Sequence, residues 1–194
     1  FRPNNFIGGL HTKSYWIKPN CVGDKLLSIQ FKPNGAKHFV PEKLVDLKNI
    51  IVDLEDIYSS NDITAINALC ITNSISKNLE IIDEFLASIF NYNDDLRVDY
   101  GLKLIADSNG FMPISEVAKS VGFSKAQFRK KFNEEVGLSP SAYNKIVRIN
   151  VLNNFRKNDI NLNLTEIAYK MGYFDQSHFI KDVKAITGMS PKQF

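Results

Sequence analysis

Two short stretches of the chain place cationic and amide side chains opposite pairs of apolar residues at helical spacing. In the first stretch, Phe128 and Phe132 lie one helical turn apart and are expected to face a core. The opposite face is small and polar, and it consists of Ala126, Lys130 and Asn133, flanked by Gln127 and Arg129. In the second stretch Phe179 and Val183 face inward, and the outward positions are Ser177, Lys181 and Lys184, flanked by Gln176, His178 and Ile180. Such side chains form hydrogen bonds with base edges and phosphates, whereas covalent chemistry requires other groups.

These stretches belong to a segment that occurs twice. Residues 123–140 align without a gap on residues 174–191, at an offset of 51. The identical pairs are Phe123/Phe174, Phe128/Phe179, Lys130/Lys181, Gly137/Gly188, Ser139/Ser190 and Pro140/Pro191. Upstream, residues 117–122 match residues 167–172 at an offset of 50, so the second copy has one extra residue.

Each copy has the sequence pattern of two helices joined by a turn. A short amphipathic helix is followed by Gly122 or Gly172, where the chain reverses. Ser124 or Asp175 can then cap the N-terminus of a second helix, which ends at a glycine. The pattern predicts helix-turn-helix units at about 113–137 and 163–188. A plain solvated helix face is the alternative for either outward surface alone, but it explains the repetition less well.

The segment between the copies predicts a long connecting helix. Ser139-Pro140 provides a cap and a first-turn proline, and apolar residues recur about every three positions up to Phe155. A helix over 140–157 would be about 27 Å long, which approaches the ~34 Å of one DNA turn. We therefore expect the two second helices to enter successive major grooves.

Residues from about 96 to 194 resemble the DNA-binding domain of the AraC/XylS family. The resemblance is carried by Ile167-Ala168, by Gly172-Tyr-Phe-Asp-Gln-Ser-His-Phe179, by Lys181 and by Gly188-Met-Ser-Pro191, together with the preceding half-copy. It implies a seven-helix domain with two helix-turn-helix units, and base contacts from Ala126, Arg129, Lys130, Gln176, Ser177, Ile180 and Lys181. Gln127 is included as a DNA-binding residue from its flanking position. Lys181 replaces a more usual Arg, Val183 replaces a Phe, and Ile180 offers only apolar contact, so we expect the second unit to read sequence less strictly.

The first half of the chain predicts a small α+β domain with an incomplete β portion. Residues 1–40 contain short apolar or alternating runs, Ser14–Ile17 and Leu26–Phe31, separated by turn residues. Residues 41–92 show helical spacing, first from Leu44 to Leu54, then over 63–71 and 76–90. Short turns within the first of these stretches are an alternative to a continuous helix. The stretch Leu27–Ala36 is similar to the end of a regulatory domain often found before such DNA-binding domains, which implies a larger β portion before Phe1.

Charge supports a boundary at residue 94. Residues 1–94 carry 9 Lys and Arg against 11 Asp and Glu, a net charge of −2, whereas residues 95–194 carry 15 against 10, a net charge of +5. A polar linker, 91–95, lies at the change of sign. The sequence thus predicts a regulatory or dimerisation domain over 1–94 and a DNA-binding domain over 95–194, in a mainly α protein.

Other chemistries have little support in the sequence. The two cysteines, Cys21 and Cys70, form no CxxC motif, so we expect no metal site, no cofactor and a reducing cytoplasmic location. No apolar run is long enough to span a membrane and no secretion leader is apparent, while isolated histidines such as His11 and His38 have no catalytic partner. We therefore expect a protein that is not an enzyme.

The leading hypothesis is a sequence-specific transcriptional regulator with double-stranded DNA as its partner. Further partners that this arrangement allows are a small-molecule effector, a second copy of the chain and, for an activator, RNA polymerase. The alternative is a DNA-repair or DNA-modifying protein that uses the same DNA-binding domain, although two isolated cysteines provide no nucleophilic or metal-bound cluster. A third hypothesis makes the first half a protein-interaction module without a ligand.

Overall fold

The computed structural model is mainly α-helical, with a two-stranded sheet near the N-terminus, which confirms the predicted fold class. The residues that it describes are 5–12, 27–59, 63–64, 66–67, 74–92, 95–158, 164–170 and 172–191. The chain forms two compact units. The first comprises residues 1–10, 17–94 and 134–137, and the second comprises residues 11–16, 95–133 and 138–194.

The first unit contains a small sheet and an apolar cluster beside it. Strands β1 (Phe6–Gly8) and β2 (Ile51–Asp53) pair antiparallel, with Ile7 opposite Val52. Val40, Leu44 and Leu47 are buried, and Ile7 and Val52 pack against them. Two 3-10 helices, η1 (Gly35–His38) and η2 (Leu54–Asp56), complete this part of the unit.

An ion pair within the first unit joins η1 to residues 134–137. Lys37 Nζ lies 2.7 Å from Glu135 Oε2, and the two side chains are only 6% and 9% exposed. The Leu44 N–H also donates to the carbonyl oxygen of Glu134 at 3.0 Å. A buried charge pair of this kind depends on both partners, because either one alone would be a desolvated charge.

Two predicted elements of the first unit are wrong. Residues 27–31 form no strand, and Leu27 and Ile29 are half exposed. Residues 41–50 form successive turns instead of a helix, and the chain then enters β2. Asn49 has a φ of 60°, which an α-helix does not accommodate, and the burial of Leu44 and Leu47 explains the apolar spacing. The predicted strand Ser14–Ile17 lies outside the described residues.

Helix α2 (Ile75–Ile89) agrees with the helix predicted over 76–90. The Ser74 side chain caps it by accepting from the Lys77 N–H. The buried residues of this helix are Ile82 and Phe85, whereas Leu79 is 51% exposed. In the helix predicted over 63–71, the described residues Ile63, Thr64, Ile66 and Asn67 are helical.

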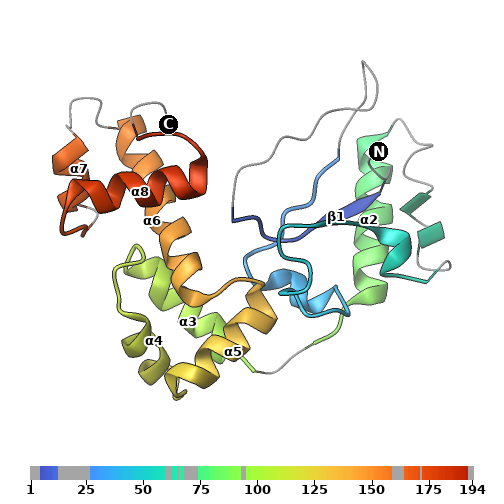
Figure 1. The fold of residues 1–194 in the computed structure, drawn as a ribbon. Coiled ribbons are helices and arrows are strands. Elements are labelled where there is room, and N and C mark those ends of the chain that lie inside the picture. Colours follow the sequence, from blue (N-terminus) through green and yellow to red (C-terminus); the bar gives the residue numbers. More distant parts are fainter. Residues whose placement is uncertain are drawn as a thin grey trace. The chain divides into compact units, whose positions relative to one another are not determined.

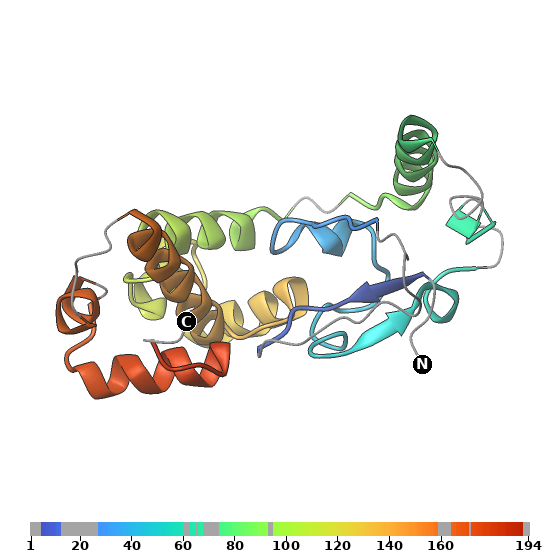
Figure 2. The ribbon, with the colours of Figure 1, turned by 90° about the horizontal axis from the view of Figure 1, so that it is seen from above.

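The second unit is mainly helical (Figure 1), and the last residues of α5, 134–136, belong to the first unit. The helices are α3 (Arg97–Asp107), α4 (Ile114–Ser120), α5 (Lys125–Val136), α6 (Pro140–Asn158), α7 (Leu164–Lys170) and α8 (Gln176–Thr187). The resemblance implied seven helices after residue 95, and the described part of that range contains α3 to α8. Helix α6 runs between the α3–α5 group and the α7–α8 pair, as both ribbon views show (Figures 1 and 2). Within the part of the chain that the structure describes, no helix has the length and hydropathy needed to cross a membrane.

Candidate nucleic-acid interface

Helix α5 begins with a reciprocal pair of capping bonds. The Gln127 N–H donates to Ser124 Oγ at 3.2 Å, and the Ser124 N–H donates to Gln127 Oε1 at 3.0 Å. This capping box satisfies two backbone donors at the first turn. The turn between α4 and α5 contains Gly122 at a φ of +75°, a conformation that favours glycine.

The faces of α5 follow the helical period. Phe128 and Phe132 are fully buried, with their ring centroids 5.4 Å apart. The predicted outward residues Ala126, Gln127, Arg129 and Lys130 are exposed, and Asn133 is half-buried. A shallow depression on this face is lined by Lys125, Ala126, Arg129, Lys130 and Asn133. The resulting surface is cationic and is formed partly by a small residue.

Arg97 stabilises the turn of the first helix-turn-helix. Its guanidinium lies 4.1 Å from the centroid of the Phe123 ring. It also donates from Nε and Nη2 to the two oxygens of Asp95, at 2.9 and 2.8 Å. The Arg97 side chain and backbone N–H hold the pKa of Asp95 at about 2. Phe123 is therefore covered on one face, although it lies in a surface turn.

Helix α6 begins as predicted and packs against both helix-turn-helix units. Ser139 Oγ accepts from the Ala142 N–H at 3.2 Å, and Pro140 is the first helical residue. Tyr143 contacts the first core through Phe132, with ring centroids 5.6 Å apart. Farther along α6, Ile149 and Leu152 are buried in the core of the second helix-turn-helix. One helix thus joins the two cores.

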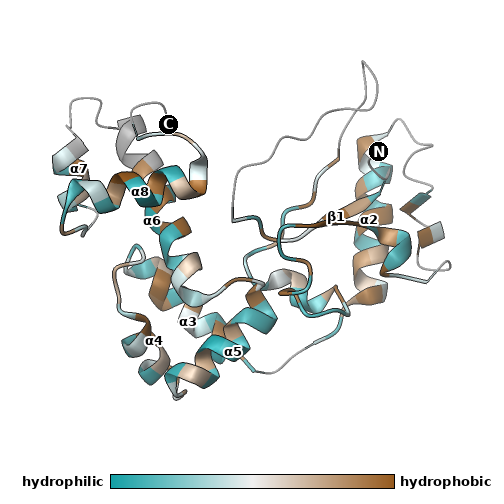
Figure 3. Cartoon of the chain, viewed as in Figure 1, coloured by the Kyte–Doolittle hydropathy of each residue, from teal (hydrophilic) through white to brown (hydrophobic). Residues whose placement is uncertain are grey.

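Helix α8 has the same design as α5. Asp175 Oδ1 accepts from the His178 N–H at 2.8 Å and caps the N-terminus. Phe179 and Val183 are fully buried, whereas Ser177, Lys181 and Lys184 are exposed. Gln176 is half-buried, and Ile180 packs partly against the core. Hydrophilic and hydrophobic residues alternate along both α5 and α8 (Figure 3).

The structural equivalence of the two turns corrects the pairing of Phe123 with Phe174. The Phe123 N–H donates to the Ala118 carbonyl, and the equivalent bond in the second copy is from the Tyr173 N–H to Ala168. Tyr173 is buried like a core residue, at 7% exposed. Phe174 is therefore the extra residue of the second turn, and it is 94% exposed.

Polar side chains of α6 bind residues of the second helix-turn-helix and of the segment before α4. Lys145 Nζ lies 2.7 Å from Asp182 Oδ1, and the Tyr173 hydroxyl donates to Asp182 Oδ2 at 3.2 Å. Arg148 Nε donates to the Gly110 carbonyl at 2.7 Å, and its guanidinium lies over the rings of Phe111 and Tyr173. The Lys145–Asp182 ion pair joins α6 directly to α8, and the Arg148 contacts join α6 to residues 110–111 and to the turn before α8.

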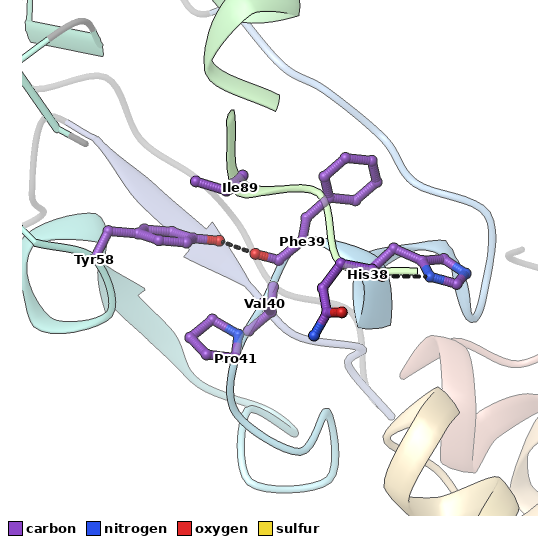
Figure 4. Close-up of a pocket in the computed structure, with 7 residues that line it drawn as sticks. His38, Phe39, Val40, Pro41, Tyr58 and Ile89 are labelled. Carbon is purple, nitrogen blue, oxygen red and sulfur yellow. Dashed lines mark hydrogen bonds between the residues drawn. The ribbon is translucent and has the colours of Figure 1, made fainter. Parts of the chain in front are cut away.

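The first unit contains a cavity of about 240 Å³ (Figure 4). Its mostly apolar wall is formed by residues 38–41, Tyr58, Ile89 and Asn91. The Tyr58 hydroxyl donates to the Phe39 carbonyl at 2.8 Å, and His38 Nδ1 lies 3.0 Å from the Asn91 carbonyl. The cavity is therefore lined by the end of η1 and the residues after it, by Tyr58 and by the end of α2.

Comparison with known proteins identifies a helix-turn-helix domain toward the C-terminal end of the chain. Residues 124–194 match a family model described as a helix-turn-helix domain, which spans α5 to α8. A search of curated proteins gave no match. Among solved structures, the chain is similar to a transcriptional regulator of the "AraC-type DNA-binding domain-containing proteins" from Chromobacterium violaceum. That likeness has 18% identity and a TM-score of 0.46, and it covers 50% of this chain and 87% of the other.

Proposed function

We propose that the protein regulates transcription by binding double-stranded DNA at specific sequences, as a regulator of the AraC type. The proposal starts from the match of residues 124–194 to a helix-turn-helix domain. The observation that carries the proposal is the outward face of α5. Arg129 and Lys130 are exposed there beside Ala126, while the opposite face is fixed by buried Phe128 and Phe132. Arg and Lys recognise guanine O6 and N7 in the major groove, and a small neighbour permits close approach.

The proposed reading residues are distributed over both second helices. On α5 they are Ala126, Gln127, Arg129 and Lys130, and on α8 they are Gln176, Ser177, Ile180 and Lys181. Each helix is capped at its N-terminus and packed by two fully buried residues, so its outward side chains project from a rigid base. In this proposal α5 and α8 enter successive major grooves of one duplex.

We assign a regulatory or dimerisation role to residues 1–94. Their net charge of −2 is unsuited to phosphate binding, and most of them lie in a unit with its own apolar cluster. Sedimentation of the purified chain over a range of concentrations tests dimerisation. A monomer mass that does not change with concentration would exclude dimerisation of this chain.

The DNA-reading face is tested with the variants Arg129→Ala and Lys130→Ala. A cognate duplex is first selected from a random pool with the whole 194-residue chain, and its affinity is measured by fluorescence anisotropy. Each variant should lose about 1–3 kcal/mol on this duplex, with a smaller loss on a scrambled one. Lys77→Ala, an exposed lysine of α2, is the matched control. If both α5 variants bind the selected duplex as tightly as the parent, the assignment of this face is wrong.

A further inference from the structure

Phe174 is exposed in a way that core packing does not explain. Phe174 is 94% exposed. Among the large apolar residues that the structure describes, the next most exposed is Ile75, at 75%. It immediately precedes Asp175, the N-cap of α8. Folding places a whole phenyl ring in water at this turn, although burying such a ring is favourable.

The first helix-turn-helix has no side chain equivalent to Phe174. Phe123 corresponds to Tyr173 by its backbone hydrogen bond, and the turn of the first helix-turn-helix passes directly from Phe123 to the N-cap Ser124. Phe123 is also covered by the Arg97 guanidinium. The exposed ring is thus present in the second helix-turn-helix and absent from the first.

The position of Phe174 indicates what covers it in a complex. In a helix-turn-helix the N-terminal residues of the second helix contact base edges, and Phe174 lies at that end of α8. The exposed Lys181 and Lys184 of the same helix complement the charge of DNA phosphates. Within the major groove the main apolar group is the C5 methyl of thymine, and phenylalanine is among the side chains that contact it.

We propose that Phe174 is a specificity-determining residue of the second helix-turn-helix and contacts a thymine methyl group at the N-terminal end of α8. The inference rests on the proposed DNA-binding function and deepens it. The half-site read by α8 contains one or more thymines whose methyl groups contribute to affinity through Phe174. The half-site read by α5 depends instead on the hydrogen-bonding side chains Arg129 and Lys130.

The test is a double-mutant cycle between protein and DNA. In the duplex selected with the whole chain, the thymines of each half-site are replaced by deoxyuridine, which removes the methyl group and keeps base pairing. The parent should lose about four-fold in affinity for each contacted methyl in the α8 half-site. Phe174→Ala should bind the thymine duplex with a similar loss, and it should lose nothing further on the deoxyuridine duplex. Met189→Ala, an exposed apolar residue beyond the other end of α8, is the matched control and should behave as the parent.

Each outcome has a defined meaning. Coupling between Phe174 and the methyl groups supports the proposal. An equal loss for Phe174→Ala on both duplexes overturns the thymine contact in favour of sugar or phosphate contact, and no loss overturns a role in DNA binding. Failure of the parent to select any duplex refutes the proposed function itself. This outcome therefore differs from one that refutes only the role of Phe174. Circular dichroism of Phe174→Ala should match the parent, since a fully exposed ring makes little contribution to folding.

Discussion

Tyr173 illustrates how one residue links packing to charge in the second helix-turn-helix. Its ring is buried against Phe179, with centroids 5.4 Å apart, while its hydroxyl donates to Asp182. Burial and the Asp182 carboxylate both disfavour the phenolate and raise the pKa of Tyr173 to about 12. The protonated form of Tyr173 therefore stabilises the folded state.

Alkaline unfolding should reveal this stabilisation. An unfolded tyrosine titrates near pH 10, whereas Tyr173 in the folded protein keeps its proton until about pH 12. The stability that it contributes is present below pH 10 and is lost as pH rises from about 10 to 12. Urea unfolding of the parent and of Tyr173→Phe between pH 8 and 11 measures this. The variant should be less stable by about 1 kcal/mol near pH 8 and should depend less on pH above 10.

Burial also raises the pKa of Tyr143, so the difference between parent and variant isolates the contribution of Tyr173. Parallel stability curves for parent and Tyr173→Phe over this range would contradict the assignment.

At the scale of single residues, helical periodicity predicted correctly which side chains of α5 and α8 are buried. Residue identity, however, misplaced the extra residue of the second turn. Phe128, Phe132, Phe179 and Val183 were expected to face inward, and all are fully buried. Phe174 was paired with Phe123 because the two are identical, but the backbone bonds of the turn place Tyr173 in that position. Residue identity cannot locate an inserted residue, because the hydrogen bonds that define the turn are formed by the backbone.

At the scale of elements, the glycines of the two turns have the same conformation and different surroundings. Gly122 has a φ of +75°, and a Cβ there would meet nothing within 4 Å. Gly172 has a φ of +65°, and a Cβ there would lie 2.8 Å from Cδ1 of Phe111. Phe111 packs against the second core and lies under the Arg148 guanidinium, so its ring is not easily displaced.

The variants Gly122→Ala and Gly172→Ala should therefore differ in stability. Both replace glycine at a positive φ, which costs about 1–2 kcal/mol. Gly172→Ala should cost roughly 1–3 kcal/mol more, because the added methyl overpacks the contact with Phe111. Thermal unfolding followed by circular dichroism measures the difference, with Gly122→Ala as the matched control. Equal losses would show that the Phe111 ring moves aside freely.

The elements that sequence predicted well are those with local signals. The caps Ser124 and Asp175 and the Ser139-Pro140 start of α6 are all confirmed by the bonds they make or the helices they begin. Residues 41–54 were predicted as helical from apolar spacing alone. Their turns and β2 depend on pairing with β1, more than 40 residues earlier, and short-range spacing carries no information about such a partner.

At the scale of the whole molecule, the charge asymmetry separates the two halves of the chain. Residues 95–194 have a net charge of +5, while residues 1–94 have −2. Neutralising phosphates with lysine and arginine releases counterions, so binding through the second half should weaken with salt. Exposed lysines of the first half should not contribute to this dependence.

The affinity of the whole chain for a selected duplex should thus fall at least about ten-fold between 50 and 200 mM salt, as expected for two or more phosphate contacts. Lys184→Gln removes an exposed cation of α8 outside the proposed base-reading set, and it should reduce the slope of log affinity against log salt by about one. Lys77→Gln removes an exposed cation of α2 and should leave the slope unchanged.

Because both changes lower the net charge by one, a reduction of the slope in both variants would indicate general electrostatic attraction. A reduction confined to Lys184→Gln indicates a phosphate contact at α8. A parent slope near zero would refute binding through phosphates altogether.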